Sequence, residues 1–168
     1  MKKVMKKLIC CTIALTCTLI LTSNLKAATL SVGSTSGSSG DKNISIPIGL
    51  TSTSGEKVCG LNFDLNFDTS RLSFKEVTLG SVATDAGKSL SFNQPSSNTI
   101  RVVVIGLNQN VIGDGKVLNF TFDILDKAPG GKAKLNIMDP SISDPKGKQL
   151  SVTVRDGEII LGKLSSEN

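Results

Sequence analysis

Apolar and polar residues alternate along most of the chain after residue 28, which is the spacing of half-buried β-strands. The most regular stretch is Leu-Asn-Phe-Asp-Leu-Asn-Phe at 61–67, whose Asn62, Asp64 and Asn66 are predicted to face away from the core. Phe63 and Phe67 point the other way and are expected in the core. Turn-forming Gly, Pro, Asp and Ser residues separate the stretches. The other predicted strands are 43–48, 72–77, 89–92, 100–107, 117–125, 132–138, 150–154 and 158–161.

The number and spacing of these strands predict an all-β fold, an antiparallel β-sandwich or jelly roll. No segment after residue 27 carries a convincing apolar stripe with a period of 3.6 residues. About 140 residues follow the first segment, which is enough for one well-filled core. All six Phe occupy apolar strand positions, and most of them are assigned to that core.

The first 27 residues have the organisation of a secretory signal peptide. Four lysines lie within the first seven residues, an apolar run follows, and Ala27 and Ala28 give a small-residue exit. The run of about 14 apolar residues is shorter than the roughly 20 that span a bilayer. We predict export to an extracellular or cell-surface location, cleavage after Ala27 or Ala28, and membrane contact only through an uncleaved signal segment. The predicted organisation is 1–27 signal peptide, 28–162 folded domain and 163–168 polar tail.

The composition after residue 27 excludes several classes of function. Five of the 19 basic residues belong to the signal segment, which leaves 14 basic and 14 acidic residues and removes the main support for nucleic-acid binding. The chain has no His for a nucleophile or zinc site, and no Trp or Tyr for stacking on sugars. Cys59 is the single Cys of this part, so neither an intramolecular disulfide nor a metal or other cofactor is predicted. With no His or Lys cluster adjacent in the sequence, Cys59 is interpreted as a partly buried small apolar residue.

Four motifs follow one another in a set order: Gly-Asp-Lys-Asn-Ile-Ser-Ile-Pro-Ile at 40–48, the strand and turn at 61–72, Ala-Pro-Gly-Gly at 128–131, and the Asp-Gly strand pair at 152–159. Together they resemble cohesin modules, the receptor modules of cellulosome scaffoldins, over nearly all of 29–162. The resemblance implies a nine-stranded jelly roll and a non-catalytic role, in which one sheet face receives the helical dockerin of an exported glycoside hydrolase. The prediction is therefore a secreted cohesin-like module that is linked to polysaccharide degradation and lies outside the classical cellulosomal type.

The resemblance also implies which residues contact the partner. Cohesins of the first type commonly carry Asn and Asp two residues apart, at the positions that Gly60 and Asn62 hold here. The resemblance puts Val102, Val104 and Gly106 outward with Val104 as an apolar anchor, whereas Arg101 favours the opposite parity. Because 102–105 are all apolar, burial of both faces of this strand is a further interpretation. The predicted partner-binding residues are Gly60, Asn62, Asp64, Val102, Val104 and Gly106.

Two other functions are weighed against a dockerin receptor. A carbohydrate-binding module on the same sandwich fold would have to rely on polar residues such as Asn108, Gln109 and Asn110, because aromatic platforms are scarce. A glycoside hydrolase needs two carboxylates across a cleft, and Asp64 and Asp68 are better interpreted as surface and turn residues. We therefore predict no catalysis and keep polysaccharide binding as the alternative.

Overall fold

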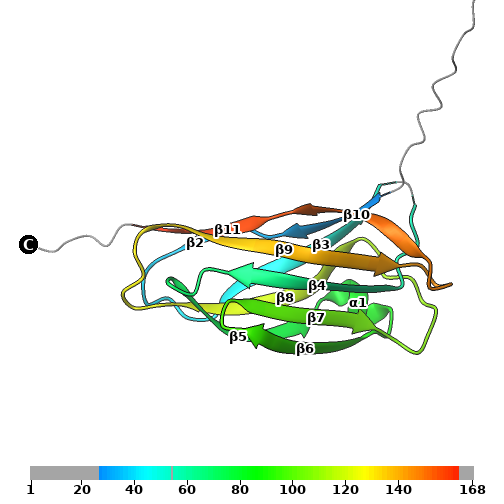
Figure 1. Ribbon diagram of the computed structural model, residues 1–168, viewed down its shortest axis with the longest axis horizontal. Coiled ribbons are helices and arrows are strands. Elements are labelled where there is room, and N and C mark those ends of the chain that lie inside the picture. The colour runs from blue at the N-terminus through cyan, green and yellow to red at the C-terminus, as the bar shows by residue number, and fades with distance from the viewer. Residues whose placement is uncertain (1–26, 54, 163–168) are drawn as a thin grey trace, which may run out of the picture.

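The computed structural model describes residues 27–53 and 55–162. The predicted signal segment and polar tail lie outside these residues, except for Ala27, which opens the first strand. The described part contains strands and one short helix (Figure 1). The elements are β1 (Ala27–Val32), β2 (Thr35–Gly37), β3 (Ile44–Ser52), β4 (Gly60–Phe67), β5 (Leu72–Leu79), α1 (Ser81–Asp85), β6 (Ser89–Ser96), β7 (Thr99–Ile105), β8 (Gly115–Ile124), β9 (Gly131–Ser143), β10 (Gln149–Arg155) and β11 (Gly157–Leu161).

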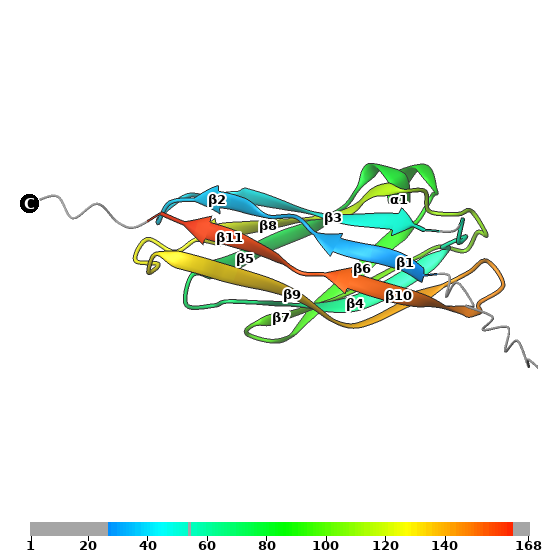
Figure 2. The ribbon, with the colours of Figure 1, turned by 90° about the horizontal axis from the view of Figure 1, so that it is seen from above.

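The strands form an elongated two-layered sandwich, which confirms the predicted all-β fold (Figures 1 and 2). Strand order along the sheet is β5-β8-β3-β1-β10-β9-β4-β7-β6, with β2 and β11 paired beside this path. Two of the strand pairs, β1 with β10 and β2 with β11, are parallel, so the sandwich is not purely antiparallel. Only two residues separate β1 from β2, and only one separates β10 from β11. If β1 and β2 are counted as one interrupted strand, and β10 and β11 as another, the eleven strands become nine. This count agrees with the predicted nine-stranded jelly roll.

Phenylalanine rings fill the space between the two layers. Phe63 and Phe67 are buried, as predicted, and Phe67 lies 5.2 Å from the ring of Phe122. Phe120 and Phe122 stack with their ring centres 6.3 Å apart. Phe92 is the exception, because it lies on the terminal strand β6 and is 49% exposed. Most of the six rings therefore belong to the core, as the apolar positions predicted.

The short helix α1 was not expected from the sequence. It has five residues, too few to display a repeating apolar stripe, and it buries only Ala83. The backbone N–H of Gly80, at its start, donates to the carbonyl of Val117 in β8 at 2.9 Å and so seats the helix on that strand. Within residues 27–53 and 55–162, no helix is long and apolar enough to cross a membrane.

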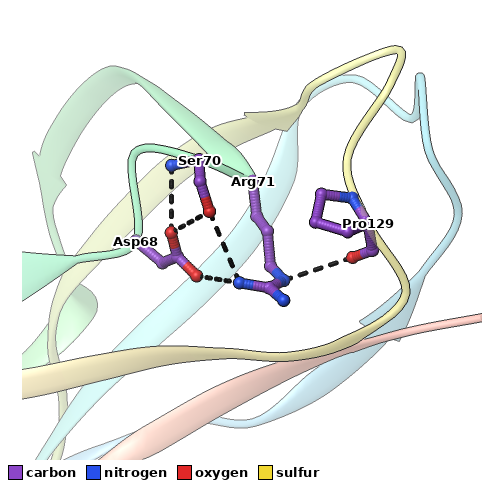
Figure 3. A network of polar contacts seen from close by, with 4 residues as sticks. All are labelled: Asp68, Ser70, Arg71 and Pro129. Carbon is purple, nitrogen blue, oxygen red and sulfur yellow. Dashed lines mark hydrogen bonds and ion pairs between the residues drawn. The ribbon is translucent and has the colours of Figure 1, made fainter.

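The turn between β4 and β5 is held by a polar network around Asp68 (Figure 3). One carboxylate oxygen of Asp68 accepts from the backbone N–H of Ser70 at 2.9 Å and from its hydroxyl at 2.6 Å, and the other accepts from Arg71. Arg71 also donates from Nε to the carbonyl of Pro129 at 3.2 Å, in the loop that leads into β9. The network ties two loops at one end of the sandwich, which supports the interpretation of Asp68 as a turn residue.

Candidate functional site

Strands β9, β4, β7 and β6 lie side by side in one layer, and the side of this layer that points away from the core is called here the outer face (Figure 1). Residues directly opposite each other on paired strands point to the same side of a sheet. Asp64, near the middle of the outer face, lies opposite Arg101 of β7 and Met138 of β9. The residues that point outward on this face include Asn62, Asp64 and Asn66 of β4, Arg101, Val103 and Ile105 of β7, and Met138 and Ser141 of β9.

A bidentate ion pair lies at the centre of the outer face. Arg101 donates from Nε and from a terminal nitrogen to the two carboxylate oxygens of Asp64, each at 2.8 Å. The Asp64 side chain is 12% exposed and that of Arg101 is 55% exposed. The hydrogen bond from Arg101 lowers the pKa of Asp64 against the opposing effect of its burial. The pair therefore fixes the guanidinium in one orientation while leaving part of it open to solvent.

The Asp64 carboxylate should make the stability of the protein depend on pH. Its pKa is lowered on folding, so its contribution is present above the unfolded value of about 3.9 and is lost as pH falls through the lower folded value. We expect the free energy of unfolding to fall below about pH 4, and Asp64→Asn to weaken this dependence and lower stability at neutral pH. Denaturant unfolding of both proteins between neutral and strongly acidic pH measures this. Identical pH profiles would contradict the assigned role of Asp64.

The predicted partner-binding residues do not all lie on the outer face. The outward orientation of Val102 and Val104 is wrong, because both are fully buried. They lie opposite Phe63 and Leu61, the inward residues of β4, so the sheet register assigns them to the core. The structure has the orientation that Arg101 indicated, in which residues 101, 103 and 105 of β7 point outward and residues 102 and 104 point into the core. Of the other predicted residues, Asn62 is exposed, Asp64 is paired and largely buried, Gly60 is buried and Gly106 is half-buried.

An apolar stripe, defined as Val103 and Ile105, runs along the outer side of β7, where the resemblance had indicated Val102 and Val104. Val103 is half-buried and Ile105 is 57% exposed. Leu107, in the following loop, is fully exposed. Gly60 lies beside the stripe, since a Cβ at that position would be 3.4 Å from Ile105 Cγ2. Contiguous exposed apolar side chains with a polar border mark a candidate contact surface for another macromolecule.

The loop after β7 is fixed to the rest of the domain, although it exposes Leu107. Asn108 donates to the carbonyl of Gly87 at 2.9 Å and accepts from Lys88 Nζ at 2.9 Å. Lys88 Nζ also lies 3.2 Å from Cys59 Sγ, a contact that the residues adjacent to Cys59 in the sequence do not indicate. The two residues are 29 apart in sequence, and only the fold brings them together. Asn108 thus anchors the loop and is not free to line a sugar site.

Open hollows lie on either side of β9, and neither resembles a sugar platform. One, of about 410 Å³, is lined mainly by polar residues of β4 and β9, including Asn66 and Lys134. The other, of about 400 Å³, lies between β9 and β11. The half-exposed ring of Phe92 packs edge-on against Phe74 with ring centres 6.0 Å apart. Across the part of the chain that the structure describes, no three His, Cys, Asp or Glu side chains are grouped to hold a metal.

An apolar stripe beside a fixed ion pair on one solvent-facing sheet has the mixed apolar and polar character of a protein-binding surface. The chain belongs to the cohesin domain family, whose profile matches residues 28–161. Cohesin domains are non-catalytic protein-interaction modules, which agrees with the prediction of a binding module rather than an enzyme. No curated protein sequence matches the chain significantly.

Solved structures with the same fold include cohesins from several organisms. The sixth cohesin of scaffoldin B from Acetivibrio cellulolyticus, solved with a mutant Cel5 dockerin, gives a TM-score of 0.73 at 23% identity, over 81% of this chain and 99% of that chain. A non-cellulosomal cohesin from the archaeon Archaeoglobus fulgidus gives a TM-score of 0.68 at 21% identity, over 83% and 94% of the two chains. CaCohA2 from Clostridium acetobutylicum gives 0.71 at 21% identity, over 84% and 94%. These likenesses confirm the fold.

Proposed function

We propose that this chain is an exported, non-catalytic cohesin module that binds the dockerin domain of another exported protein through its outer face. The partner class is supported by solved relatives of the same fold that are complexes with dockerins. The basic and apolar start of the chain supports export. A dockerin-bearing partner that acts on polysaccharide would link the module to polysaccharide degradation.

The observation that carries this proposal is the apolar stripe of Val103 and Ile105 on the outer face. Ile105 exposes more than half of its surface on a strand whose inward residues are fully buried. The stripe is bordered by polar residues, with Ser89 opposite Ile105 and Ser91 opposite Val103 on β6. Interfaces of this kind have an apolar centre that loses water and a polar rim that stays hydrated.

Ile105→Lys should weaken dockerin binding by at least about tenfold, because a charge placed in the contact centre loses water without gaining a partner. The matched control is Ile160→Lys, since Ile160 is 48% exposed but lies on β11, beyond β9 at the far margin of the same layer and three strands from β7. This control should change affinity by less than about twofold. Isothermal titration calorimetry of the three proteins against a panel of purified dockerin domains gives both values.

The same titrations can reject the proposal. If the unchanged protein binds no dockerin of the panel, or if the two lysine variants lose affinity equally, the apolar stripe is not the centre of a dockerin site. Thermal unfolding of both variants guards against a folding defect, and both should melt close to the unchanged protein because both isoleucines are exposed. Val104 is unsuitable for this test, because a lysine there would disrupt the core instead.

A further inference from the structure

Lys88 and Cys59 lie in contact. They immediately precede β6 and β4, respectively, which begin at the end of the sandwich that carries α1 (Figure 1). The Nζ to Sγ distance is 3.2 Å. Lys88 is only 5% exposed, whereas Cys59 is half-buried. The amine is therefore enclosed by protein, while Cys59 keeps part of its surface in contact with solvent.

The lysine nitrogen is held in a single position against the sulfur. Besides Cys59, Nζ donates to the side-chain oxygen of Asn108 at 2.9 Å and to its backbone carbonyl at 3.4 Å. Asn108 is fixed in turn, because its amide donates to the carbonyl of Gly87 and its oxygen accepts from the backbone N–H of Asn110 at 3.0 Å. A nucleophile held this close to a reacting atom has a high effective concentration.

We propose that Lys88 and Cys59 are a modification site, at which a peroxide converts the contact into a covalent lysine–cysteine crosslink. Sulfenic acids condense with nearby nitrogen or thiol groups, and Lys88 supplies the nitrogen. Cys59 is the single cysteine among residues 27–53 and 55–162, so the structure offers its sulfur no thiol within this domain. The fixed amine is the group that the sulfur meets first.

The chemistry balances with one equivalent of hydrogen peroxide. The sulfur attacks one peroxide oxygen and the O–O bond breaks, which gives the sulfenic acid and a first water that carries the thiol proton. The amine, after releasing its extra proton to solvent, then attacks the sulfur. An S–N bond forms, the S–O bond breaks, and the hydroxyl leaves as a second water with a proton from nitrogen. Sulfur is oxidised, the peroxide is reduced, and the protein loses two hydrogen atoms.

Such a crosslink would join the beginnings of β4 and β6 at the margin of the outer face. It would close the covalent loop between residues 59 and 88, which includes β5 and α1. Crosslinks that close loops restrict the unfolded chain, so the oxidised protein should melt at a higher temperature. Thiol reductants should reverse the modification, as they do for other first-stage oxidation products of cysteine.

The test is to treat the purified protein with hydrogen peroxide, digest it with trypsin and analyse the peptides by mass spectrometry. Crosslinked Lys88 resists trypsin, so the product should join residues 58–71 to residues 76–101, with two hydrogens fewer than the two peptides together. Dithiothreitol should release both peptides and restore cleavage after Lys88.

Lys88→Arg is the matched control, because it keeps a cation at this position without the primary amine. Cys59 of this variant should be oxidised to sulfinic and sulfonic acids, and no linked peptide should form. The proposal is overturned if Cys59 of the unchanged protein stays reduced, joins a second chain, or is oxidised while trypsin still cleaves after Lys88. These outcomes are read from the unchanged protein, so they do not require the variant to fold. They are also independent of dockerin binding.

Discussion

Replacing Phe122 by alanine is expected to lower the free energy of unfolding by about 3–5 kcal/mol, the usual range for a buried Phe. Phe122 is fully buried between the layers and contacts three other rings, with ring centres 5.2 Å from Phe67, 6.0 Å from Phe74 and 6.3 Å from Phe120. These rings come from three strands in the two layers, so neither layer can close over the space that alanine leaves. Denaturant unfolding at neutral pH measures the loss.

Phe92→Ala is the matched control for Phe122→Ala. Its ring is 49% exposed at the terminal strand of the sheet and touches Phe74 alone among the rings of residues 27–53 and 55–162. Its loss should cost less than about half of that for Phe122, because part of the ring already contacts water. Equal losses in the two variants would mean that the core is not centred on the rings between the layers.

Gly80→Ala should produce the second large effect on stability. A Cβ at Gly80 would lie 2.5 Å from the carbonyl carbon of Lys116 in β8, and closer still to its oxygen. Both atoms are backbone, so they cannot move aside as a flexible side chain would. Overpacking of this kind typically costs about 1–3 kcal/mol, and here it should also displace α1 from β8. The unfolding free energy reports the first change, and amide hydrogen exchange of Ser81–Asp85 reports the second.

Gly113→Ala provides the comparison for Gly80→Ala. A Cβ at Gly113 would meet no atom within 4 Å, and Gly113 does not have a positive φ. Alanine at such a position restricts the unfolded chain and should leave stability unchanged or raise it by up to about 1 kcal/mol. If Gly80→Ala behaved like Gly113→Ala, the close approach of this segment to β8 would not be a constraint on the fold.

Strand β4 could be predicted from the sequence almost completely, whereas β7 could not. In β4, each apolar residue alternates with a polar one, so only one orientation buries Phe63 and Phe67. In β7, residues 102–105 are all apolar, and the pattern fits either orientation. The decision rests on Arg101, whose partner Asp64 lies on the neighbouring strand. In the sequence, the charge of Arg101 was therefore the one indication that residues 103 and 105 point outward. The family resemblance indicated residues 102 and 104 instead.

Other features depend on contacts that no local pattern encodes. The approach of Lys88 to Cys59 requires β4 and β6 to begin at the same end of the sandwich. The helix α1 is too short for its periodicity to be visible, and it is held instead by its contact with β8. The parallel pairs are β1 with β10 and β2 with β11, and they lie on either side of short interruptions of one or two residues in these two segments. The alternation of apolar and polar residues does not show which neighbour a strand pairs with, or in which direction.

The two terminal strands of the sheet, β5 and β6, have consequences for aggregation. An unpaired strand edge can recruit an edge from another molecule and start a fibril. Pro95 in β6 has no backbone N–H to donate, and β5 has an irregular register between Phe74 and Glu76, at the charged Lys75. Each edge thus carries a feature that interrupts strand addition. Neighbouring copies held at high local concentration should therefore have little tendency to join through β5 or β6.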